Sequence, residues 1–66
     1  MNVVLYTTHC PKCKILEKKL NQKNIPFEVV TDIELMKEKE YFSVPILELD
    51  GIGMNFKDAN EWINKN

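Results

Sequence analysis

The stretch that decides the fold is Cys10-Pro11-Lys12-Cys13, which follows the apolar run VVLY at residues 3–6 after three polar residues. A continuous apolar run of this length predicts a strand that is buried on both faces. Pro11 suits the first position of a helix, where its missing N–H leaves no hydrogen bond unmade. We therefore expect a buried strand at 3–6, a polar loop at 7–9, and a helix whose N-cap is Cys10.

The helix that starts at Pro11 should end near residue 24, before Pro26. Within it, Cys13, Leu16 and Leu20 follow the i, i+3, i+7 spacing of one helical stripe, whereas lysines occupy much of the rest. We expect this stripe to face the core, so that Cys13 is shielded from water.

Two further elements are predicted before residue 41. Residues 27–30 (FEVV) have the composition of a second strand. Thr31 and Glu34 have the S/T-x-x-E spacing of a capping box, which predicts a short second helix that runs to about residue 40.

The last part of the chain predicts a hairpin and a closing helix. Residues 44–49 form the expected third strand, and Asp50-Gly51 is a strong signal for a two-residue turn into a fourth strand at 52–56. A final helix carries Ala59, Trp62 and Ile63 at i, i+3, i+4. The element order is βαβαββα, which predicts one α/β domain over residues 1–66, with a four-stranded mixed sheet flanked by helices.

Composition and charge narrow the function classes. The formal net charge is −1, and all nine basic residues are lysines. The absence of arginine argues against nucleic-acid recognition. No apolar run approaches the ~18 residues of a membrane span, and the N-terminal residues do not have the pattern of a signal peptide. We expect a cytoplasmic monomer, and in that compartment paired cysteines are more often catalytic or metal-binding than structural.

The C-x-x-C motif at a helix start predicts thiol–disulfide chemistry. A sulfur at the N-cap faces the free N–H groups of the first turn and the positive end of the helix dipole, so Cys10 is the expected nucleophilic thiolate. Cys13 lies one turn further in and can attack the mixed disulfide to release the product. Because Cys13 is shielded, we expect its thiol to keep a higher pKa.

The two cysteines have two alternative uses, as zinc ligands or as a structural disulfide. A tetrahedral zinc site needs four ligands, usually cysteine or histidine, and besides Cys10 and Cys13 the only such residue in the chain is His9. A static disulfide would close a very short loop and stabilise little. The thiolate of Cys10 can be favoured by positive charge on His9, Lys12 and Lys14. An equally good interpretation is that all three are ordinary solvated side chains.

These residues resemble the glutaredoxins, within the thioredoxin superfamily, over nearly the whole chain. The resemblance rests on the strand, the C-x-x-C helix, Ser43-Val44-Pro45, the Asp50-Gly51 turn and the terminal helix. It implies a thioredoxin-like fold, a cis Val44–Pro45 bond beside the cysteines, and pairing of the Val44 backbone with an extended substrate. The residues that it implies for substrate binding are Pro11, Lys12, Val44, Pro45 and Asp58.

The departures from the family concern glutathione. Glutathione-binding members usually carry a lysine where this chain has Thr7, and a Gly-Gly pair where it has Asn55-Phe56. We therefore expect a dithiol electron carrier, without a resident cofactor or metal, that reduces protein disulfides and uses glutathione weakly. A flavoprotein of the thioredoxin-reductase type is the alternative reductant. An iron–sulfur cluster or metal shared by two chains through Cys10 is the alternative function.

Overall fold

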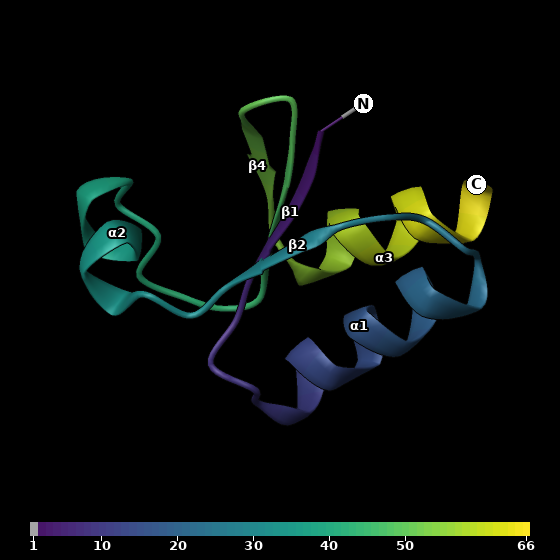
Figure 1. The fold of residues 1–66 in the computed structure, drawn as a ribbon, viewed down its shortest axis with the longest axis horizontal. Helices are drawn as coiled ribbons and strands as arrows, with labels where there is room; N and C mark the ends of the chain where they lie inside the picture. The colour runs from purple at the N-terminus through teal and green to yellow at the C-terminus, as the bar shows by residue number, and fades with distance from the viewer. Residues whose placement is uncertain (1) are drawn as a thin grey trace.

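The computed structural model describes residues 2–66, and within them the predicted element order βαβαββα is confirmed (Figure 1). The elements are β1 (Val3–Tyr6), α1 (Pro11–Gln22), β2 (Glu28–Val30), α2 (Ile33–Glu38), β3 (Ile46–Leu49), β4 (Ile52–Met54) and α3 (Phe56–Lys65). No helix of this part of the chain is long and apolar enough to cross a membrane.

The four strands form one mixed sheet in the order β2-β1-β3-β4. The β1–α1–β2 crossover makes β1 and β2 parallel, whereas β1–β3 and β3–β4 are antiparallel. The turn between β3 and β4 is formed by Asp50 and Gly51, which both have positive φ, 49° and 88°. This backbone geometry matches the right-handed twist of the flanking strands, as the Asp-Gly pair predicts.

Alternation along β1 sends side chains to two different cores. Val3 and Leu5 pack with the buried faces of α1 and α3, and Val4 and Tyr6 pack with Met36 of α2. Figure 1 shows α2 on the opposite side of the sheet from α1 and α3. The burial of β1 on both faces is therefore confirmed.

The predicted stripe of α1 is also confirmed. Cys13, Leu16 and Leu20 are fully buried, and Leu16 and Leu20 pack with Ala59 and Ile63 of α3 beneath the sheet. Packing of this kind fixes the axis of α1, and through it the position of its first turn, where the cysteines lie.

Helices α1 and α2 both end earlier than predicted, and for the same reason. The helix α1 ends at Gln22, not near residue 24, because Asn24 turns into the left-handed region and Ile25 N–H donates to Leu20 O. The helix α2 ends at Glu38, not near residue 40, because Glu40 has φ 62° and Tyr41 N–H donates to Met36 O.

The predicted capping box at Thr31 is wrong by one residue. Asp32 is the N-cap of α2, and its carboxylate accepts hydrogen bonds from the N–H groups of Glu34 and Leu35. A carboxylate caps as well as a hydroxyl does, so the Thr31 spacing did not decide the helix start.

Three strand boundaries also differ from the prediction. The strand β2 starts at Glu28, and β3 starts at Ile46, directly after a proline that has no N–H to donate to a sheet. The strand β4 ends at Met54 because Asn55 caps α3, which makes Phe56 the first residue of a helix and not the end of a strand.

Candidate active site

The loop from β1 to α1 is ordered by Thr7, which is fully buried. Its N–H donates to Val30 O of β2, and its Oγ1 accepts a hydrogen bond from His9 N–H at 2.9 Å. His9 adopts φ 62° and is exposed. The contact that His9 makes within this loop is through its backbone, and the tight turn brings Cys10 to the start of α1.

Cys10 occupies the N-cap of α1, as predicted. Its backbone is extended (φ −70°, ψ 165°), and its Sγ accepts a hydrogen bond from Cys13 N–H at 3.3 Å. The two sulfurs lie 2.7 Å apart, and both cysteines are free thiols. A disulfide has a sulfur–sulfur distance of ~2.05 Å, so the two side chains are already arranged for disulfide formation within the first turn.

The two sulfurs differ in exposure. Cys10 is half-buried, whereas Cys13 has no exposed surface. A disulfide of another molecule can therefore reach Cys10 and not Cys13.

The expectation that shielding keeps the Cys13 pKa high is wrong. Burial raises the pKa of the Cys13 thiol, but hydrogen bonds from the side chains of Cys10 and Thr7 and from the backbone of Thr8 and Cys10 outweigh burial, and the pKa is lowered. The Cys10 thiol lies 2.7 Å from the Cys13 sulfur, so a proton that it donates stabilises negative charge on Cys13.

A basic groove of about 330 Å³ lies beside the motif. Its walls come from α1, the segment before β3, and the start of α3, and they comprise Lys12, Ser43, Val44, Pro45, Asn55, Phe56 and Lys57. Lys12 reaches across to α3, where its Nζ lies 5.6 Å from the centroid of the Phe56 ring. The Val44–Pro45 peptide bond is cis, as the family resemblance implies.

The structure brings together only some of the residues that were predicted to contact a substrate. Lys12, Val44 and Pro45 line the basic groove, whereas Pro11 and Asp58 are exposed and do not line it. Asp58 lies in the first turn of α3, and its N–H donates to the Asn55 side chain at 2.9 Å. Substrate contacts of all five residues stay predictions.

Sequence reasoning missed Thr7 and Thr8 as contributors to the site. Both lower the pKa of the Cys13 thiol, Thr7 through its side chain and Thr8 through its backbone. Thr–x–His is a spacing at which a hydroxyl can accept a backbone N–H two residues on, and this weak signal was the one available. Among residues 2–66, no group of three or more histidine, cysteine, aspartate or glutamate side chains could hold a metal ion.

Comparison with protein-family models, curated proteins and solved structures finds no match for this chain. Functional assignment therefore depends on the geometry of the two thiols and the groove beside them. An accessible sulfur at a helix N-terminus, with a second sulfur behind it, can exchange electrons with an external disulfide.

Proposed function

We propose that this protein is a dithiol thiol–disulfide oxidoreductase of the glutaredoxin kind, with a thioredoxin-like fold, that reduces disulfides in other proteins. The observation that carries the proposal is the pair of free thiols in the first turn of α1, with Cys10 at the N-cap and its sulfur 2.7 Å from that of Cys13. The mixed sheet, with α1 and α3 on one face and α2 on the other, supports the fold assignment.

The first step is attack by the Cys10 thiolate on one sulfur of a substrate disulfide. A bond forms between Cys10 Sγ and that sulfur, the substrate disulfide breaks, and the other substrate sulfur leaves as a thiolate that takes up a proton. Cys10 performs this step because it is accessible and because the N–H of Cys13 stabilises its charge.

The second step resolves the mixed disulfide. Cys13 Sγ attacks Cys10 Sγ, the bond to the substrate breaks, and the second substrate thiolate leaves. The substrate has then gained two electrons, and the protein has lost two as a Cys10–Cys13 disulfide. Cys13 Sγ attacks as a thiolate, and its position directly behind Cys10 keeps the two sulfurs within reach of each other.

A reductant must return the protein to the dithiol form, and we propose that glutathione serves poorly in this role. A carboxylate that docks at the start of α3 has to compete with the Asn55 side chain for the N–H of Asp58. At the other end of the site, Thr7 has no charge and is buried. A protein reductant of the thioredoxin-reductase type, or another small thiol, fits these features better.

The deciding experiment is an assay of insulin disulfide reduction, with glutathione plus glutathione reductase in one arm and thioredoxin reductase in the other. The parent protein should be active, and most active in the second arm. Cys10→Ser should abolish turnover, and Cys13→Ser should accumulate mixed disulfides that mass spectrometry detects. Glu61→Gln is the control substitution, because Glu61 is exposed on α3 and does not line the basic groove. Absence of reduction in both arms would sink the proposal, and visible absorption of anaerobically purified protein would point to an iron–sulfur cluster instead.

A further inference from the structure

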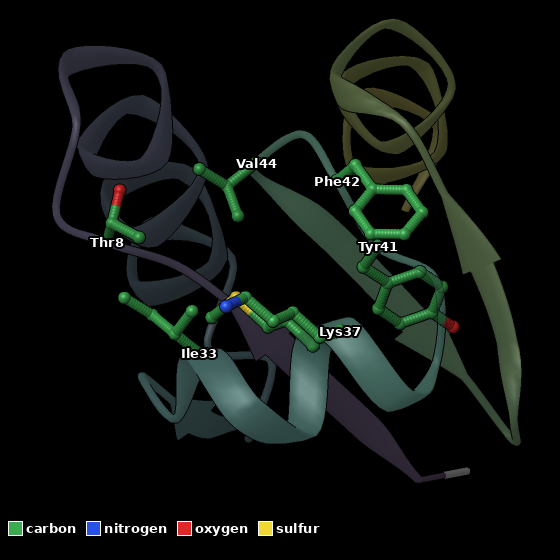
Figure 2. Close-up of a pocket in the computed structure, with 7 residues that line it drawn as sticks. Thr8, Ile33, Lys37, Tyr41, Phe42 and Val44 are labelled. Carbon is green, nitrogen blue, oxygen red and sulfur yellow. The ribbon is translucent and has the colours of Figure 1, made fainter.

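A second depression, of about 220 Å³, is lined in part by α2 (Figure 2). Its lining comes from the loop before α1, from α2, and from the segment between α2 and β3. The lining residues are Thr8, Ile33, Met36, Lys37, Tyr41, Phe42 and Val44. We call this depression the α2 pocket.

The α2 pocket is apolar, with a single charge. Met36 is buried, whereas Phe42 and Ile33 expose 81% and 55% of their surface. Figure 2 shows Phe42 and Ile33 on opposite sides of the opening, with Lys37 beside Ile33. The lining includes no acidic side chain. Large apolar side chains that gather around an open hollow are typical of a surface that binds a partner.

The α2 pocket is continuous with the thiol site. Thr8 lines the pocket, and it belongs to the loop that leads from β1 to Cys10. Val44 lines both the α2 pocket and the basic groove. An extended chain that crosses Val44 therefore has the apolar hollow on one side and, on the other, the groove that holds Lys12 and Lys57.

Building on the proposed function, we infer that the α2 pocket is a specificity pocket for the protein substrate. It binds a large apolar side chain within two residues of the target cysteine, and the basic groove accommodates an acidic residue on the other side of that cysteine. An extended chain advances ~3.3 Å per residue, so a side chain one or two positions away reaches either hollow while the cysteine stays at Cys10.

A polypeptide fits this pair of hollows better than a small thiol does. A glutathione-like thiol has polar and charged ends, which leave Phe42 and Ile33 exposed to water. An aromatic or branched aliphatic side chain covers them, and burial of apolar surface is the main source of affinity in such pockets. The lysines on both sides oppose a basic substrate and favour an acidic one.

The test uses the Cys13→Ser protein and five-residue peptides whose central cysteine carries a coloured thionitrobenzoate leaving group. Cys10 displaces the leaving group, and its release gives the rate. Phenylalanine is placed at each flanking position in turn in an alanine background, and the same leaving group on 2-mercaptoethanol serves as the small disulfide. At the matching position, phenylalanine should raise the ratio of peptide rate to small-disulfide rate about tenfold.

Variants of the pocket then locate the effect. Ile33→Ser and Phe42→Ser should each remove most of the gain, whereas Ile52→Ser should not. Ile52 is a matched control because it is an equally apolar, exposed residue in β4 and does not line the pocket. If phenylalanine has no effect at any position, or if all three variants lower the ratio equally, the inference is wrong.

A second readout separates this inference from the proposed function. The best peptide, with its cysteine replaced by serine, should shift the backbone amide signals of Thr8, Ile33 and Phe42 in the reduced parent protein. Saturable shifts without thiol–disulfide exchange on any disulfide would support the specificity pocket and contradict the proposed redox function. Exchange on the small disulfide without these shifts would retain the redox function and sink the pocket.

Discussion

The Cys13 side chain has no exposed surface, yet its pKa is lowered and not raised. Its burial follows from the spacing of Cys13, Leu16 and Leu20, and this spacing is visible in the sequence. The hydrogen bonds that oppose burial come first from the Cys10 side chain, and then from Thr7 and Thr8 in the loop before α1. This loop turns at His9, which has φ 62°, and a positive φ at histidine has no reliable local signature, so the pKa direction could not be predicted.

The division of roles between the cysteines predicts the order of alkylation. Reduced protein treated with iodoacetamide at pH 6 should be modified first at Cys10, because Cys10 is half-buried and Cys13 is fully buried. Peptide mass mapping at short times gives the order. In urea the difference should vanish, which serves as the control. Faster labelling of Cys13 in the folded protein would mean that Cys13, and not Cys10, is the attacking cysteine.

Gly53 lies close to the Tyr41 side chain, where a larger residue would not fit. A Cβ added at this position would lie 2.7 Å from Tyr41 Oη, which is closer than real contacts allow. Gly53→Ala should therefore push the Tyr41 ring away and lower the free energy of unfolding by about 1–3 kcal/mol, measured by urea denaturation. In combination with Tyr41→Phe the effects should be less than additive, because both disturb the same contact. Simple additivity would mean that the strand, and not Tyr41, absorbs the change.

At the scale of elements, the short helix α2 is held by a buried carboxylate of β3. Glu48 accepts hydrogen bonds from Lys39 Nζ at 2.9 Å, from Tyr41 Oη at 2.8 Å and from Tyr6 Oη at 3.3 Å. Tyr6 and Tyr41 also pack edge to face, with ring centroids 5.2 Å apart. Because α2 has only six residues, these contacts at its C-terminal end help to fix one wall of the α2 pocket.

The same cluster predicts an acid-sensitive stability. Burial raises the pKa of Glu48, but hydrogen bonds from Lys39 and Tyr41 outweigh it and hold the pKa below its ordinary value of 4.5. A lowered folded-state pKa gives stability that is present above the unfolded value and is lost as the pH falls through the folded value. Glu48→Gln should lower the free energy of unfolding at pH 7 by about 1–3 kcal/mol.

The pH profile of this variant distinguishes charge from shape. As the pH falls below 4.5, the difference between Glu48→Gln and the parent should shrink progressively, because the unfolded parent takes up the proton first and the folded carboxylate, with its lowered pKa, takes it up at lower pH. Glu28→Gln is the control, since Glu28 is exposed on β2; its denaturation curves should overlay those of the parent. An offset for Glu48→Gln that stays constant from pH 7 to pH 3 would assign the effect to packing.

For the whole molecule, periodicity and turn chemistry were sufficient to predict the architecture. The apolar run of β1 predicts a central strand, and the Asp50-Gly51 turn predicts the β3–β4 hairpin. The α2 pocket could not be predicted in this way. Its wall includes Tyr41 and Phe42, which belong to no helix or strand, and Tyr41 is held by its hydrogen bond to Glu48.

Under the proposed function, the choice of reductant depends on the three segments that meet at the basic groove. Binding of a carboxylate at the start of α3 needs backbone N–H groups that are free, but Asn55 occupies the N–H of Asp58, and Phe56 holds the Lys12 side chain. Exposed lysines contribute only about 0.2–1 kcal/mol each, which is less than the ~1.5–3 kcal/mol of a hydrogen bond to a charged group. The parent protein should therefore show weak glutathione-coupled turnover.

Removing the two side chains at the start of α3 should strengthen glutathione binding. Asn55→Gly with Phe56→Gly frees the N–H of Asp58 and releases Lys12, and glycine at an N-cap loses only a few tenths of a kcal/mol relative to asparagine. We expect glutathione to bind this double variant about tenfold more tightly, measured from the amide shifts of Val44 and Asp58, with a matching gain in glutathione-coupled turnover. Asn55→Ser with Phe56→Gly is the matched control, because serine caps the same N–H and should gain much less. Equal gains in both variants would assign the effect to the size of Phe56, and saturable sub-millimolar binding by the parent would show that glutathione is recognised without these groups.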